Sequence, residues 1–511
     1  MNLEAIFSGT ENLIMSTIFK RIAPLLDKFS GSVARFYAFA AFLTLVFFTG
    51  GSSRDDVQSL VILRPLAILF GAYALTCMKW ETWKGRAFPL YIALALAVLM
   101  VLQLIPLPPK VWPTLPGRQI FADIADLAGI AQPWRPLTLS PSRTLNSLFS
   151  LAIPISAMML YLNLDTRHRK QSIAVIITLA GISALWAAIQ LVGPDRGPFY
   201  LYNITNDGAA VGLFANRNHQ SVLLAATIVM LGWYGASQTA PAKLAGLKLY
   251  ISVAAIYVII PLIFITGSRA GLILMVPALV TAMSLIYFGR STPQIQPPTN
   301  VFSINKKWYA SRNTILFICA ALVIVMGTLS IYFSRSLAFD RLFERSNVEG
   351  LRGQLLPILT QMAGDYFPWG SGFGSFEHIY RIYEPQELLN PTYLNHAHND
   401  WLQFPIEGGL PAIMILVVTA IWGIMQFITL ARNWRYSDYT NFTAIMAAVV
   451  MLLFLAASFG DYPLRVPSLI AVFAVMACIL RDNLREDEEK MKNGNERTPL
   501  LDRSRDRRFT P

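Results

Sequence analysis

The chain has 511 residues, of which 54% are hydrophobic and only 14% are charged, and its mean hydropathy is +0.47. A soluble protein carries about a quarter charged residues, so this composition excludes an ordinary soluble enzyme and indicates a single polytopic membrane protein. The net charge of +12 is distributed in the way that membrane orientation demands, which argues against nucleic acid as a partner.

Apolar runs long enough to cross a hydrocarbon core of about 30 Å, roughly 17–25 residues each, recur along the chain. Twelve candidates lie near 34–49, 60–78, 88–106, 144–163, 172–192, 211–235, 249–266, 270–288, 313–333, 408–431, 441–459 and 466–481. The first is short and the pair around 266–270 is barely separated, so the range is eleven to thirteen. Backbone polar groups inside a bilayer must be paired within the protein, so the runs are helices and the fold class is all-α.

Lysine and arginine gather in every second connection, and this asymmetry predicts which connections are cytoplasmic. Both termini fall on that side: residues 1–33 form a cytoplasmic segment, and residues 482–511 form a tail whose mixed charges indicate disorder. The opposite side receives the proline-rich segment 107–143 and the longest non-spanning stretch, 334–407. The domain between the termini, residues 34–481, therefore carries a large loop before its tenth helix.

The stretch HAHND, residues 396–400, ends that loop immediately before a spanning helix. Asn399 or Asp400 would cap a helix that begins at Trp401. The stretch EGGLP, residues 407–411, would then break this helix, because its two glycines permit a sharp bend and its proline can open the spanning helix. A helix start beside His398 offers unpaired N–H groups, which favour an anionic ligand. Two alternatives stay open: the histidines are interfacial polar residues and Asp400 is only a cap, or His396, His398 and Asp400 bind a metal. No Cys/His set with zinc spacing accompanies them.

Several arginines lie on the predicted non-cytoplasmic side of the membrane or at its surface there. Arg269, in TGSRAG (266–271), lies at a depth where ionisable residues are often functional, although a long side chain also snorkels to the interface. Arg341, Arg345 and Arg352 stand close together in the long loop and could hold a pyrophosphate, or could simply be solvated. Arg217 belongs to the polar stretch NRNH (216–219), which could also be only a helix cap.

These four stretches together resemble the O-antigen ligase family, also called the ligase/polymerase superfamily of bacterial surface glycans. His398 and Asn399 begin its His-Asn motif, Gly409 matches the first glycine downstream, and Ala412 replaces the last one. GSRAG resembles the family's Ser-Arg-Gly/Ala element, LRGQLLPILTQMAGDYFPWGSGFGSF its arginine-to-glycine loop segment, and FANRNH its Asn-rich element. The resemblance covers most of residues 90–480 and implies about twelve transmembrane helices in a GT-C-like glycosyltransferase.

The resemblance also implies an activity: transfer of a glycan from undecaprenyl pyrophosphate on the periplasmic face of the bacterial cytoplasmic (inner) membrane, without cofactor or metal. His398 is the predicted base for the acceptor hydroxyl, with Asn399 or Asp400 orienting its ring. Arg269 and Arg352 are predicted to stabilise the pyrophosphate leaving group. The predicted substrate-binding residues are Arg345, Arg341, Asn399, Asp400, Arg217 and His396.

Three enzymes would share these residues: a ligase that uses lipid A–core as acceptor, which we rank first, a repeat-unit polymerase, and a protein O-oligosaccharyltransferase. A lipid-linked glycan flippase or another transporter is the alternative of a different class. A transporter places charges at mid-depth in several helices. Here the arginines and histidines gather at one face, apart from Arg64 early in the second span, which favours an enzyme.

Overall fold

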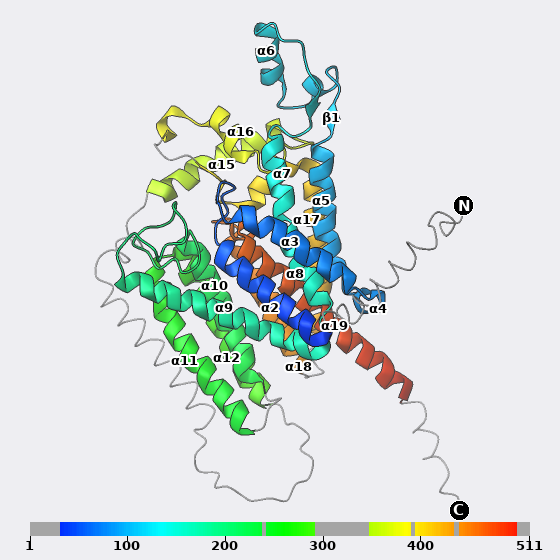
Figure 1. Ribbon diagram of the computed structural model, residues 1–511, viewed down its shortest axis with the longest axis vertical. Coiled ribbons are helices and arrows are strands. Elements are labelled where there is room, and N and C mark those ends of the chain that lie inside the picture. The colour runs from blue at the N-terminus through cyan, green and yellow to red at the C-terminus, as the bar shows by residue number, and fades with distance from the viewer. Residues whose placement is uncertain (1–30, 238–241, 292–346, 390–393, 434–438, 498–511) are drawn as a thin grey trace, which may run out of the picture.

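The computed structural model describes residues 31–237, 242–291, 347–389, 394–433 and 439–497 (Figure 1). The described chain is helical apart from one small antiparallel sheet, in which β1 (Pro106–Leu107) pairs with β2 (Arg135–Pro136). This agrees with the all-α class predicted from the apolar runs.

Seven helices of the described chain are long and apolar enough to cross a membrane. They are α2 (Ser32–Thr49), the joined pair α7 (Pro141–Ser150) and α8 (Ala152–Leu162), α9 (Thr166–Val192), α11 (Ala242–Thr266), α12 (Arg269–Ser291), α17 (Asp400–Asn433) and α19 (Pro467–Arg497). Shorter apolar helices are α3 (Leu60–Thr76), α5 (Phe88–Gln103) and the described part of α18 (Tyr439–Ala457). The predicted span at 313–333 lies outside the described residues.

Helix α10 (Arg217–Ala236) lies inside the bundle, and every residue from His219 to Trp233 is buried. Small residues let α12 pack closely against it, because a Cβ atom added at Gly232 would collide with Ala282 and one added at Gly271 would collide with Ser221. Both helices run in the same direction, so this packing places the start of α12 beside the start of α10.

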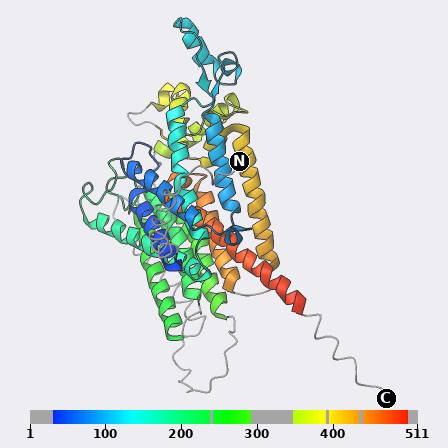
Figure 2. The same cartoon turned by 45° about the vertical axis from the view of Figure 1, so that its right-hand side comes forward.

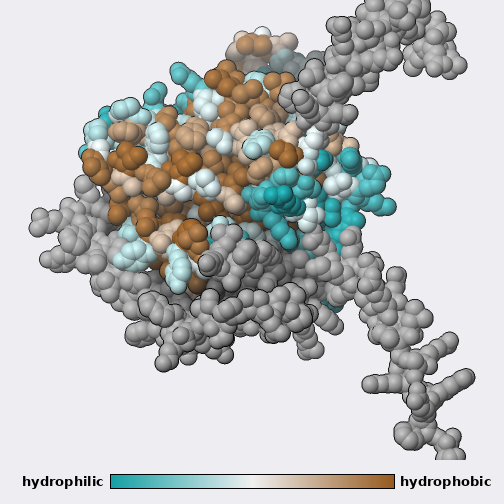
Figure 3. Space-filling model, turned by 60° about the horizontal axis from the view of Figure 1, so that its bottom comes forward, coloured by the Kyte–Doolittle hydropathy of each residue, from teal (hydrophilic) through white to brown (hydrophobic). Residues whose placement is uncertain are grey.

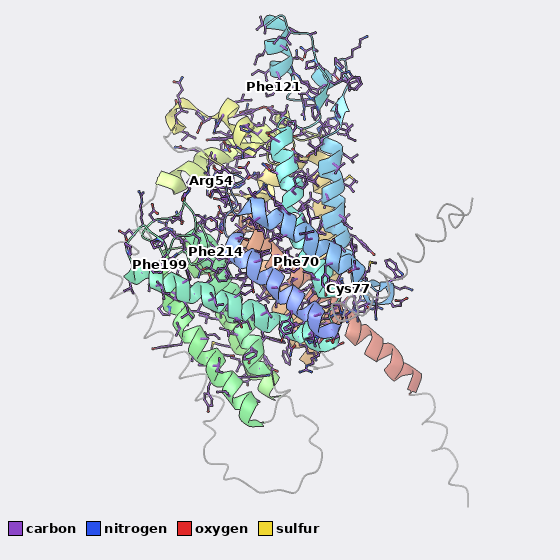
Figure 4. All side chains as sticks on the ribbon, in the orientation of Figure 1. Arg54, Phe70, Cys77, Phe121, Phe199 and Phe214 are labelled. Carbon is purple, nitrogen blue, oxygen red and sulfur yellow. The ribbon has the colours of Figure 1, made fainter. Side chains whose placement is uncertain are left out.

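One end of the bundle carries α6 (Gln119–Leu127), α15 (Asn347–Asp365) and α16 (Phe376–Tyr383), and we call it the loop end (Figures 1 and 2). The shorter elements are the 3-10 helices η2 (Trp112–Thr114), η4 (Gln386–Leu388) and η5 (Pro463–Arg465), and α4 (Trp80–Trp83), which lies toward the other end. Helix α3 runs from the loop end toward α4, and Figure 4 labels Arg54 before this helix and Cys77 after it.

A bend at Gly409 divides α17 into a short first segment and a long second one. Gly409 has φ 60° and ψ −152°, a conformation that only glycine adopts readily, and an added Cβ atom would collide with the carbonyl oxygen of Pro368. At this bend the backbone N–H of Leu410 donates to Pro368 O at 2.7 Å. The bend predicted from EGGLP therefore seats the loop segment around Pro368 against the start of the spanning helix.

At the opposite end, buried Asp482 accepts from Arg86 and Arg169, and these ion pairs join the connection before α5, and helix α9, to α19. Helix α19 continues to Arg497, so the first part of the predicted tail is helical. Figure 3, which brings this end forward, shows hydrophobic side chains over most of the described surface. Side chains such as Val61 and Ile273 are exposed, at 76% and 71%, as expected for helices that face lipid.

Candidate active site

His398 stands at the loop end, just before α17, in a strained backbone conformation. Its φ is 50°, and among the described residues it has the only positive φ outside glycine. Such a conformation costs on the order of 1–3 kcal/mol and persists where the surroundings impose it, often at functional sites. In this backbone conformation the ring faces the connection between α18 and α19, where His398 Nδ1 lies 3.5 Å from Asp461 Oδ1.

Asp461 is the centre of the polar cluster and is 2% exposed. Its Oδ2 accepts from Asn218 Nδ2 at 2.7 Å, its Oδ1 accepts from the backbone N–H of Tyr462 at 2.9 Å, and His219 Nε2 lies 3.6 Å from Oδ1. Burial alone would raise the pKa of Asp461, but the facing imidazoles of His219 and His398 hold it well below its ordinary value. The carboxylate is therefore charged, and it can stabilise a proton on either ring.

The ring of Tyr462 lies among three of the five histidines in the chain. The ring centroids of His396, His398 and His219 lie 4.5, 4.8 and 5.2 Å from the centroid of Tyr462. Burial, followed by the charge of Asp461, raises the pKa of the Tyr462 hydroxyl well above its ordinary value, so the phenol stays neutral. Tyr462 thus separates the imidazoles without adding charge.

A second ionic group holds the start of α17 in place. Arg465 donates from Nε to Asp400 Oδ1 at 2.8 Å and from Nη1 to Glu407 Oε2 at 3.1 Å. Ser458 Oγ donates to the other oxygen of Asp400 at 3.2 Å, and Gln403 Nε2 donates to Glu407 Oε1 at 3.0 Å. Because Glu407 is fully buried, its charge depends on Arg465 for compensation.

Four of the predicted residues come together here, with altered roles. Asn399 caps α17, since its Oδ1 accepts from the backbone N–H of Leu402 at 3.2 Å. The sequence led us to expect that Asn399 or Asp400 orients His398; Asp400 instead pairs with Arg465, and the carboxylate beside the ring belongs to Asp461.

His396 points toward Gln403, whose Nε2 lies 3.3 Å from His396 Nδ1. Burial and then the charge of Arg465 lower the pKa of His396 well below its ordinary value, so its imidazole is neutral. This histidine is therefore a hydrogen-bonding group at neutral pH.

The structure describes only some of the arginines that the sequence predicted for the site. Arg217 is the first residue of α10 and Arg269 the first of α12, and the packing of Gly271 on Ser221 sets both helix starts at the loop end. Arg352 lies in the first turns of α15, and only its backbone is described. Arg341 and Arg345 lie outside the described residues.

Sequence reasoning missed Asp461, Tyr462 and Arg465, which all lie in FGDYPLRVP, residues 459–467. An acidic residue, a tyrosine and an arginine within a connection of this length are a readable signal for polar function beside a membrane. That signal gains meaning only when the connection is set against HAHND in three dimensions.

A cavity of about 400 Å³ adjoins the cluster, and His396, Asp400 and Arg465 form part of its wall. Its other polar wall residues include Arg54, Asp55, Arg64, Arg143, Asn146, Glu377 and Asn395. The rest of the wall is mainly apolar and comes from α3, α5, α8, α17, α18 and α19. Among the described residues, no group of three His, Cys, Asp or Glu side chains is arranged to hold a metal ion.

These features define a multi-pass membrane protein with a buried histidine–carboxylate cluster at one end of its bundle. The family model described as O-Antigen ligase matches residues 253–417, so the chain carries a domain of the O-antigen ligase/polymerase type. The match confirms the resemblance read from the sequence and includes Arg269, Arg352 and His398, whereas Asp461 lies beyond it. No curated protein matches the chain.

Proposed function

We propose that this protein is a metal-independent glycosyltransferase of the bacterial cytoplasmic membrane. It transfers a glycan from undecaprenyl pyrophosphate to an acceptor hydroxyl, that of lipid A–core in our first-ranked proposal, on the periplasmic face. The observation that carries the proposal is His398: a strained histidine inside an O-antigen ligase domain, 3.5 Å from a buried and charged carboxylate.

In the proposed reaction, the acceptor oxygen attacks the anomeric carbon and forms the new glycosidic bond as the bond to the pyrophosphate oxygen breaks. A sugar hydroxyl is a poor nucleophile, so His398 takes its proton as the bond forms. The charge of Asp461 stabilises the resulting imidazolium, in the way that a carboxylate assists histidine in hydrolytic triads. The electron pair of the broken bond leaves on the pyrophosphate, and a single displacement inverts the anomeric carbon.

The leaving pyrophosphate gains negative charge, and guanidinium groups are suited to stabilise it. We assign this role to Arg269 and Arg352, with Arg345 as a helper. We also assign Arg341 and Arg217 to the proposed anion-binding surface. In support, the starts of α10 and α12 lie side by side at the end of the bundle where His398 stands.

A repeat-unit polymerase or a protein O-oligosaccharyltransferase would use the same residues, because the chemistry at the anomeric carbon is the same. A flippase is less well supported, since the histidines and their carboxylates gather at the loop end instead of along a path through the bundle.

The test is a transfer assay with purified protein, an undecaprenyl-pyrophosphate glycan and lipid A–core, resolved on a gel. One discrete shift of the lipid A–core band supports a ligase. Lengthening of the donor glycan without that shift identifies a polymerase. Absence of any transfer, with donor flipping in proteoliposomes, would replace the enzyme by a transporter.

Sidedness has its own test, which uses a cysteine introduced at Asn395. Labelling of this thiol by a membrane-impermeant reagent in intact spheroplasts supports a periplasmic site. Protection until the membrane is opened would place the site in the cytoplasm and contradict the proposal.

A further inference from the structure

The cavity beside His396 is long and changes character along its length. On α5 it is lined by Pro89, Ile92, Ala93, Leu96 and Met100. At 1.5 Å per residue, these positions span about 16 Å along the helix, roughly half of a hydrocarbon core of about 30 Å. A cavity of about 400 Å³ is within the usual size of a ligand site. Its shape and composition suit an amphiphile that has an apolar chain and a polar head.

The polar end of the cavity contains four arginines, and three of them face carboxylates. Arg54 pairs with Asp56, Arg143 with Asp55 and Glu377, and Arg465 with Asp400 and Glu407. The carboxylates that line the cavity, Asp55, Glu377 and Asp400, are thereby each matched to an arginine. These pairs leave little net positive charge for a ligand.

Arg64 differs from the other three. Its Nη1 donates to Asn146 Oδ1 at 3.1 Å and its Nε donates to Ser150 Oγ at 3.3 Å, and it forms no ion pair with any described residue. It lies in the second turn of α3, a helix whose exposed flank carries Val61 and Leu69. An arginine at membrane depth with only neutral partners is costly, and such residues usually mark a site for an anion.

We infer that the cavity holds the part of the lipid donor's apolar chain that is nearest the phosphate, and that Arg64, fixed by Asn146 and Ser150, binds that phosphate. The inference rests on the proposed function for the identity of the lipid. Polyprenyl pyrophosphate has its first phosphate where the chain ends, and Arg64 stands where the apolar wall of the cavity gives way to polar residues. Arg269 is not part of this wall, and the proposed function assigns it to the second phosphate, whose bond to the sugar breaks.

Binding measured without any glycan or acceptor tests this inference. The purified full-length protein in detergent is titrated with undecaprenyl phosphate and with undecaprenol, and bound lipid is counted by native mass spectrometry. Arg64→Gln is expected to weaken undecaprenyl phosphate binding about 10- to 100-fold, the usual loss for a charge-assisted hydrogen bond, and to leave undecaprenol unchanged. Arg64→Lys is expected to fall between, because it keeps the charge but not the planar fork.

Two further variants serve as a control and a second test. Arg196→Gln removes an arginine that is 83% exposed and pairs with Asp207 away from the cavity wall, so it should bind both lipids normally. Ala93→Phe fills the apolar wall and should weaken both lipids alike. This second variant tests the cavity even if Arg64→Gln does not fold.

The outcomes separate the inference from the proposed function. Unchanged binding of undecaprenyl phosphate by folded Arg64→Gln would overturn the inference, as would an equal loss of undecaprenol binding. Arg64-dependent binding by a wild-type protein that transfers no glycan would leave the inference standing and remove the proposed function.

Discussion

Replacement of Asp461 by asparagine tests the catalytic cluster most sharply, because the two side chains have nearly the same size. The amide oxygen of the new side chain can still accept from the backbone N–H of Tyr462, and its amide nitrogen replaces Oδ2, where it can donate to the Asn218 amide once that group turns its oxygen inward. The fold of the 461–465 segment should therefore persist. What disappears is the negative charge 3.5 Å from His398 Nδ1.

The size of the effect follows from that distance. Opposite unit charges about 4 Å apart attract by about 4 kcal/mol at an effective dielectric constant of about 20. The His398 side chain is 24% exposed to solvent, so we expect about half of this attraction to act on the imidazolium in the transition state. About 2 kcal/mol corresponds to a loss of about 30-fold in kcat, with little change in the KM of the donor.

The assay is single-turnover glycan transfer by purified wild type and Asp461→Asn, with donor saturating. Asp207→Asn is the matched control, because Asp207 is a carboxylate in the connection between α9 and α10 that pairs with exposed Arg196 at 2.6 Å. A folded Asp461→Asn protein that transfers glycan within about threefold of wild type would refute the role of the carboxylate.

Three further predictions concern stability. Gly409→Ala should lower the free energy of unfolding by about 3 kcal/mol or more, because the new methyl group collides with the carbonyl of Pro368 in a backbone conformation that only glycine adopts readily. Gly423→Ala is the control: this glycine faces open space on the same helix, so the melting temperature should stay unchanged or rise slightly. Arg465→Met should lower the free energy of unfolding by about 3–5 kcal/mol and reduce the melting temperature, because the carboxylates of Asp400 and Glu407 lose their cation. An unchanged melting temperature would contradict the role of these ion pairs. The pKa of His396 is lowered in the folded state, so acidification below pH about 6.5 protonates the unfolded chain first and lowers the free energy of unfolding by at most about 1.4 kcal/mol per pH unit. The melting temperature of His396→Gln should therefore fall less between pH 7.5 and pH 5.5 than that of wild type. An equal fall in both proteins would refute this prediction.

The sequence predicted the local features of the site because they are contiguous. HAHND followed by EGGLP contains a cap, a helix start and a bend within one segment, and the structure shows Asn399 as the cap and Gly409 at the bend. Patterns of this kind depend on neighbouring residues alone, so they can be read without a fold.

The partners of His398 could not be predicted in this way. Asp461 approaches His398 because α18 packs against α10 and α17 while α19 packs against α17 and α18, and no local pattern encodes that packing. The apolar run near 211–235 predicts helix α10, but no local pattern shows that this helix lies inside the bundle, with every residue from His219 to Trp233 buried.

The most direct test of the central claim is the rate of glycan transfer by His398→Ala, compared with wild type in the purified system. Membrane insertion and undecaprenyl phosphate binding should be unchanged, since His398 is assigned to the acceptor proton. The account predicts that transfer falls by about 10²–10⁴, the usual contribution of a general base. Transfer at the wild-type rate by a folded His398→Ala protein would contradict it.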